Sequence, residues 1–213
     1  MLTDKDKMRI STKVCEIEAF SHAEIVTAFT ERCDHYPEIP WKAFALGTAL
    51  TAATLSLAGG LFDDWIASQP TFALALSLCG GLILMLLTAV LPPFARLFLD
   101  PARAEAEARQ YAEGLFLQHE LFATPARRAV LLLVARFERK VVILPDHGLQ
   151  KTLTQPVLDS IIAVMAARLA HGELVAAFDA GLAALANFLR APAPGSPAVG
   201  NQLPDEPIVI CEP

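Results

Sequence analysis

Residues suited to catalysis are sparse in this 213-residue chain, and they form no complete catalytic motif. A cysteine phosphatase needs an arginine six positions after its nucleophile, and none of the four cysteines has one. Asp4-Lys-Asp6 has the spacing of an aspartyl phosphatase motif but does not follow an apolar strand. A phosphate-binding loop and a His-Glu-x-x-His zinc motif are both absent from the sequence. The residues alone therefore identify no nucleophile and no catalytic metal.

The cysteines and the charges narrow the class of protein further. The cysteines are widely spaced, without metal-ligand spacing, which favours isolated reduced thiols (Cys15, Cys33, Cys79 and Cys211). The net charge is −6 and no basic block is present, which argues against nucleic-acid binding. Charged residues make up 19% of the chain, below the roughly 25% of soluble domains. This deficit is local, because residues 43–62 and 65–95 carry no charge at all.

Two apolar segments account for that deficit, at residues 43–62 and about 72–91. A 20-residue helix spans about 30 Å, which matches the hydrocarbon core of a bilayer. Pro92-Pro93 ends the second segment, and Trp41 and Trp65 flank the first, as interfacial tryptophans do. Glycine and alanine recur on both segments and allow close helix contact. The pattern predicts a transmembrane helical hairpin; the alternative is a buried hairpin in a soluble protein.

Lysine and arginine predict the orientation of this hairpin. Basic residues precede the first segment and follow the second, whereas the loop at 63–70 has two aspartates and no basic residue. The first forty residues are polar and show no cleavable signal. We therefore expect a multi-pass protein of the inner (cytoplasmic) membrane, with both termini in the cytoplasm.

The rest of the chain alternates helix and strand patterns. Helices are predicted at 3–20, 101–118, 156–170 and 173–190, and strands at 24–30, 129–135 and 141–144, with an edge strand at 207–211. This order favours a small α/β sandwich with helices on both faces of the sheet. Because one predicted strand precedes the hairpin, the hairpin interrupts the domain. The expected division is 1–42 and 99–213 for the soluble domain and 43–98 for the hairpin.

Three stretches of sequence are similar to one known family. The run from Val130 to Leu149 resembles the central signature of the TPM domain, with an apolar strand, a Glu-Arg turn, a second strand and an Asp-x-Gly turn. Residues 201–210 resemble the Asn-Glu-Leu-Pro-Asp ending of a bacterial membrane branch, with Gln202 in place of glutamate. Ser21-His-Ala-Glu-Ile25 resembles the family opening Thr-Ser-Gly-Glu-Ile but lacks its glycine.

The resemblance implies an α/β/α sandwich and suggests a site. The family name carries a phosphatase label from plant relatives in photosystem repair, and other relatives resemble assembly accessories or calcium binders. Four carboxylates match acidic positions of the family pattern: Glu24, Glu138, Asp146 and Asp205. If they converge, their oxygens suit Ca²⁺ or Mg²⁺. Separate structural roles are the alternative, as turn formers and caps.

Two functions from different classes follow. One is a membrane-tethered binding or assembly module on the cytoplasmic face, with a protein partner and no turnover. The other is a divalent-metal-dependent phosphatase, which rests on the family label and the four carboxylates. The convergence of those carboxylates in the folded chain distinguishes the two.

Overall fold

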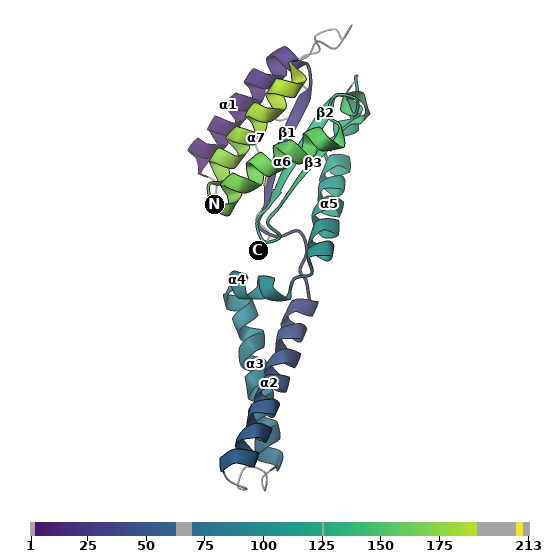
Figure 1. The fold of residues 1–213 in the computed structure, drawn as a ribbon. Coiled ribbons are helices and arrows are strands. Elements are labelled where there is room, and N and C mark those ends of the chain that lie inside the picture. Colours follow the sequence, from purple (N-terminus) through teal and green to yellow (C-terminus); the bar gives the residue numbers. More distant parts are fainter. Residues whose placement is uncertain (1–2, 63–69, 125, 191–207, 211–213) are drawn as a thin grey trace. The chain divides into compact units, whose positions relative to one another are not determined.

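The computed structural model describes residues 3–62, 70–124, 126–190 and 208–210, and these group into two compact units (Figure 1). One unit is Met1–Cys33 together with Ala104–Pro213, and the other is Asp34–Arg103. The first unit is a mixed α/β domain, and the second is built on two long helices. Both boundaries lie outside the apolar segments, so each long helix falls within one unit.

The α/β domain contains a four-stranded sheet in the order β3-β2-β1-β4. Its strands are β1 (Glu24–Thr30), β2 (Ala129–Ala135), β3 (Lys140–Pro145) and β4 (Ile208–Ile210). β1 runs parallel to both β2 and β4, and β2 pairs antiparallel with β3. The predicted strands at 24–30 and 129–135 and the edge strand in the tail are confirmed. All seven residues of β2 are buried, which explains why its sequence is apolar without alternation.

Helices cover both faces of this sheet (Figure 1). α1 (Asp4–Ser21), α6 (Gln155–Ala170) and α7 (Leu174–Leu189) share one core with side chains such as Phe29 and Leu132. α5 (Pro101–Gln118) packs on the opposite face, where Ala112 and Leu115 meet Leu131 and Leu133. The predicted sandwich is therefore confirmed. α1 starts where predicted because Thr3 and Asp6 form a reciprocal capping box.

The second unit is part of the chain segment that connects the two parallel strands β1 and β2. β1 and β2 are neighbours, so the chain must leave the end of β1 and return to the start of β2. That connection carries α2 (Glu38–Phe62), α3 (Pro70–Val90), the short α4 (Pro92–Ala95), the 3₁₀ turn η1 (Arg96–Phe98) and α5. α2 and α3 pack side by side (Figure 1).

The predicted spans at 43–62 and 72–91 correspond to α2 and α3, with different starts. α2 begins at Glu38, before the apolar segment, because Pro40 is tolerated in a first helical turn. Within the described residues, α3 is the one helix that combines the length of a membrane span with a high mean hydropathy, 2.4. The fold therefore supports one such helix by length and composition.

Candidate functional site

Asp146 directly follows β3 and caps the 3₁₀ turn η3 (His147–Leu149). The side chain of Arg127 donates to both of its oxygens, from Nε to Oδ2 at 2.8 Å and from Nη2 to Oδ1 at 2.9 Å. The backbone N–H of His147 donates to Oδ1 at 2.7 Å. Asp146 is only 5% exposed, so its carboxylate is held inside the fold by these three hydrogen bonds. This arrangement joins the end of β3 to the loop that precedes β2.

Gly148 lies against the same loop. A Cβ atom at this position would lie 2.5 Å from the carbonyl oxygen of Ala126 and 2.6 Å from that of Arg127. The backbone N–H of Gly148 donates to the Arg127 oxygen at 2.8 Å. We call this arrangement of Asp146, Gly148 and Arg127 the clamp. Asp146 binds the side chain of Arg127, and Gly148 leaves space for the backbone of Arg127 because it has no side chain.

The clamp predicts a pH dependence. Burial raises the pKa of Asp146, but the Arg127 hydrogen bonds and the His147 N–H outweigh it, so the pKa is lowered overall. A carboxylate whose pKa is lowered by folding stabilises the fold above its unfolded pKa, about 3.9, and loses that effect as the pH falls. Because Arg127 is half exposed, we expect Asp146→Asn to cost about 1–2 kcal/mol at pH 7.

Thermal melts of the wild type and Asp146→Asn between pH 7 and pH 2 check this expectation. The difference in stability should be constant near neutral pH and shrink as the pH falls below about 4. A difference that persists unchanged to pH 2, or no difference at pH 7, contradicts the clamp.

Glu138 has a second structural role at the opposite end of the sheet. It is 6% exposed, and its Oε1 accepts the backbone N–H of Cys33 at 2.8 Å. Nearby, Arg136 Nη1 donates to both oxygens of Glu31 at 2.9 and 3.0 Å. Arg139 completes the turn in the left-handed region, with φ of 53°. The Glu-Arg turn therefore fastens the β2–β3 connection to the segment where the chain leaves β1.

The strand register separates the predicted metal ligands. Glu24 lies opposite Ala129, and Asp146 donates its N–H to the carbonyl oxygen of Ala129 at 2.8 Å. Glu24 and Asp146 thus share one end of the sheet. Glu138 lies beyond the far end of the seven-residue β2, about 20 Å away at the rise of a strand. Asp205 falls outside the described residues.

These positions do not allow one ion to be bound by Glu24, Glu138 and Asp146 together. Among the residues that the structure describes, no group of three or more His, Cys, Asp or Glu side chains has an arrangement that suits a metal ion. Glu24 with Asp146 remains a predicted pair at the amino end of β1.

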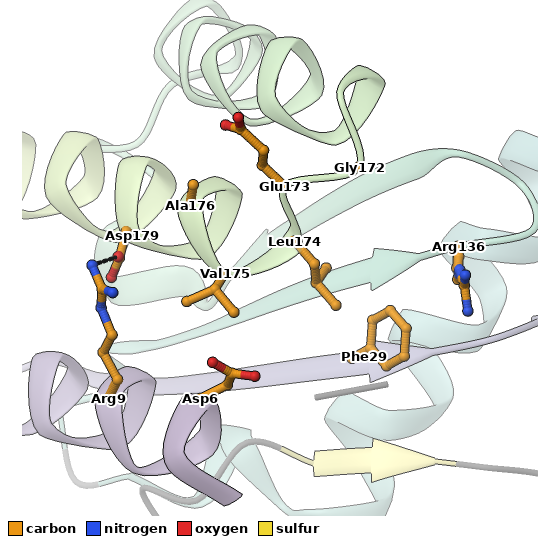
Figure 2. Close-up of a pocket in the computed structure, with 10 residues that line it drawn as sticks. All are labelled: Asp6, Arg9, Phe29, Arg136, Gly172, Glu173, Leu174, Val175, Ala176 and Asp179. Carbon is orange, nitrogen blue, oxygen red and sulfur yellow. Dashed lines mark ion pairs between the residues drawn. The ribbon is translucent and has the colours of Figure 1, made fainter. Parts of the chain in front are cut away.

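A separate hollow of about 500 Å³ lies at the carboxyl ends of β1 and β2 (Figure 2). In open α/β sheets this edge is where ligands usually bind. The hollow is bounded by the start of α1, the start of α7 and the ends of the two strands. Its lining comprises Asp6, Arg9, Phe29, Arg136, Gly172, Glu173, Leu174, Val175, Ala176 and Asp179.

Of the charged residues that line this hollow, Arg9 and Asp179 pair with each other. Arg9 Nη2 lies 2.6 Å from Asp179 Oδ2, and Lys13 Nζ lies 3.0 Å from Asp179 Oδ1. Arg136 pairs with Glu31, as described above. Figure 2 shows Arg9 pointing to Asp179 while Leu174 and Val175 form an apolar wall. Because both arginines of the lining are paired and Asp6 and Glu173 add carboxylates to it, this hollow suits a polar, uncharged or peptide-like ligand better than a phosphate ester.

The sequence predictions missed this hollow. One signal was available, since Asp179 is the only charged residue within the apolar helix α7. Its partners could not be identified from sequence, because Lys13 and Asp179 are 166 positions apart.

Comparison with known proteins agrees with this fold. The model of the TPM domain family matches residues 97–188. The NMR structure of BA42 protein from the psychrophilic bacterium Bizionia argentinensis superposes with a TM-score of 0.52 at 13% identity, covering 98% of this chain and 95% of that one. At that identity the likeness concerns the fold alone. No curated protein sequence matches the chain.

Proposed function

Because the model of the TPM domain family matches residues 97–188, we propose that this chain is a membrane-tethered TPM domain that acts as a binding or assembly module. In this proposal α2 and α3 form a transmembrane hairpin, and the α/β domain lies on the cytoplasmic side. The hollow at the carboxyl ends of β1 and β2 is its candidate contact site for a protein partner.

The distribution of apolar side chains on the hairpin is the observation that carries the proposal. Fourteen of the twenty exposed large apolar side chains in the described residues lie between Trp41 and Leu97. α3 in particular exposes Leu74, Leu82, Ile83 and Leu86. A soluble monomer rarely exposes so continuous an apolar surface, and a bilayer covers it.

Small and polar residues occupy the interior of the same hairpin. The buried residues of α3 are Ser77, Gly81 and Thr88. A Cβ on Gly47 of α2 would lie 2.6 Å from the carbonyl oxygen of Gly80. In membrane proteins, small residues lie at the helix–helix interface and leucines face outward, because the association of the helices depends on close backbone packing. A soluble helical hairpin has the reverse arrangement.

The basic residues support the cytoplasmic placement of the domain. Lys42 precedes the apolar part of α2, and Arg96 follows α3, whereas residues 63–70 have no basic residue. Under the positive-inside rule this distribution keeps both termini in the cytoplasm.

The structural hydrogen bonds of Asp146 and Glu138 favour a binding module without turnover over a metal-dependent phosphatase. Asp146 is engaged by Arg127, and Glu138 by the backbone of Cys33. The pair that remains at one end of the sheet, Glu24 and Asp146, is the arrangement on which the phosphatase alternative depends.

Assays of the purified full chain test the proposal against this alternative. We expect no hydrolysis of para-nitrophenyl phosphate and no rise in melting temperature with Ca²⁺, Mg²⁺ or Mn²⁺. An ion bound with a dissociation constant 100-fold below its concentration would stabilise the fold by about 2.7 kcal/mol, which a melt detects readily. Hydrolysis that is lost in Glu24→Gln but retained in Glu113→Gln, an exposed control on α5, would establish the phosphatase instead.

A further inference from the structure

The chain changes direction sharply at the end of α3. Leu91 is extended, with φ of −115° and ψ of 92°, and the prolines at 92 and 93 begin α4. α4 continues into η1, so residues 92–98 form one short α4–η1 segment. Within this unit, Figure 1 shows the segment running across the end of the α2/α3 pair instead of extending α3.

The α4–η1 segment has one packed side and one exposed apolar side. Ala95 is 1% exposed, and Phe94 and Phe98 stack edge to face with their ring centres 5.5 Å apart. Leu97 is 76% exposed, the highest value among the exposed large apolar residues described. Lys42 Nζ donates to the carbonyl oxygen of Phe98 at 3.3 Å and thereby ties η1 to the start of α2.

Trp41 is next to that tie and is 63% exposed. The sequence on either side of it changes from charged to apolar. Before it come Asp34 and Glu38, and both of these carboxylates pair with Arg103 at 3.0 Å. After it, α2 continues to Phe62, a distance of about 30 Å at helical rise, which is the thickness of a hydrocarbon core. Trp41 thus marks the border between the charged cluster and the apolar length of the hairpin.

We propose that the α4–η1 segment and Trp41 bind the phospholipid headgroup layer as an in-plane collar, which fixes the depth of the hairpin. This inference rests on the proposed membrane function and names its lipid contact. Tryptophan prefers the headgroup level, where the negative lipid phosphates lie, and Lys42 and Arg96 add positive charge at this part of the chain. The exposed apolar residues Val90 and Leu91 of the hairpin lie seven and six positions before Leu97 in the chain. Since the proposed bilayer covers the hairpin up to those residues, lipid is favoured over a separate protein partner for Leu97.

Spin-label depth measurements on the full chain in phospholipid vesicles test the collar. Single cysteines replace Leu97, Leu86 or Ser160 in a chain whose native cysteines are alanine. Leu86→Cys reports the hydrocarbon core and Ser160→Cys, on α6, reports water. We expect Leu97→Cys to show oxygen and nickel-chelate collision rates between those of the other two labels.

The controls separate the collar from the membrane proposal. Leu97→Cys matching Ser160→Cys, or matching Leu86→Cys, overturns the collar while leaving the hairpin in the membrane. If the collision rates of Leu86→Cys match those of Ser160→Cys, the membrane proposal itself is overturned.

A second measurement leaves Leu97 intact and uses the fluorescence of Trp41. In the variant Trp65→Phe, Trp41 is the sole tryptophan. Its emission should be blue-shifted from that in water and quenched most by lipids brominated near the headgroup. Emission at the water wavelength without quenching overturns the collar.

Discussion

Gly148→Ala is expected to destabilise the α/β domain by about 1–3 kcal/mol, because the added methyl group has no space. The atoms that it meets are backbone carbonyl oxygens of Ala126 and Arg127, at 2.5 and 2.6 Å, and they cannot move aside as the end of a flexible side chain can. Their displacement also shifts the guanidinium that binds Asp146. Thermal unfolding of the full chain, followed by circular dichroism, measures this effect.

Gly114→Ala is the matched control for that substitution. Gly114 lies within α5, and a Cβ there meets nothing within 4 Å. Alanine in a helix interior is favoured over glycine by about 0.5–1 kcal/mol, so this variant should be slightly more stable than the wild type. Equal stabilities for the two variants would contradict the role of Gly148 in the clamp.

Gly47→Leu is the second substitution with a large expected effect, and it acts on the hairpin. A side chain at Gly47 would enter the backbone of α3 at Gly80 and Gly81, so the two helices must separate. Close packing is the main attraction between helices in a bilayer, and its loss is expected to cost about 1–3 kcal/mol. The midpoint of thermal unfolding in detergent micelles should fall accordingly.

Ala49→Leu tests whether that effect is specific to the helix interface. Ala49 is two residues further along α2 and is exposed, so a larger apolar side chain there should face lipid or detergent without cost. If both variants lower the midpoint equally, the helices do not meet through Gly47. If neither does, the close approach of the two backbones is wrong.

Local sequence signals predicted most of the elements. The strand Ala129–Ala135 was predicted at its observed bounds because arginines flank a run of seven apolar residues. The helix Pro101–Gln118 was also predicted at its bounds, since proline marks a first turn. Both depend on neighbours in sequence. The start of α2 was predicted five residues late, because apolarity marks a membrane segment and not the beginning of its helix.

The candidate sites depend on contacts between distant residues, and there the sequence was a weaker guide. The family pattern suggested four carboxylates that would bind an ion if they converged, but β2 holds Glu138 at the opposite end of the sheet from Asp146 and Glu24. The partner of Asp146 is Arg127, which lies in a loop without periodicity. The hollow requires α1 and α7 to be adjacent, which only the folded sheet determines.

The central claim is that the α2/α3 hairpin crosses the membrane with the domain in the cytoplasm. Labelling of a Ser68→Cys variant by a membrane-impermeant maleimide in intact cells tests it most directly. The proposal places the native Cys15, Cys33 and Cys211 in the cytoplasm and Cys79 in the bilayer, where the reagent does not reach them. The wild-type protein is therefore the unlabelled control. The proposal predicts that Ser68→Cys is labelled in intact cells while the wild type is not. Labelling of Ser68→Cys only after lysis would contradict it.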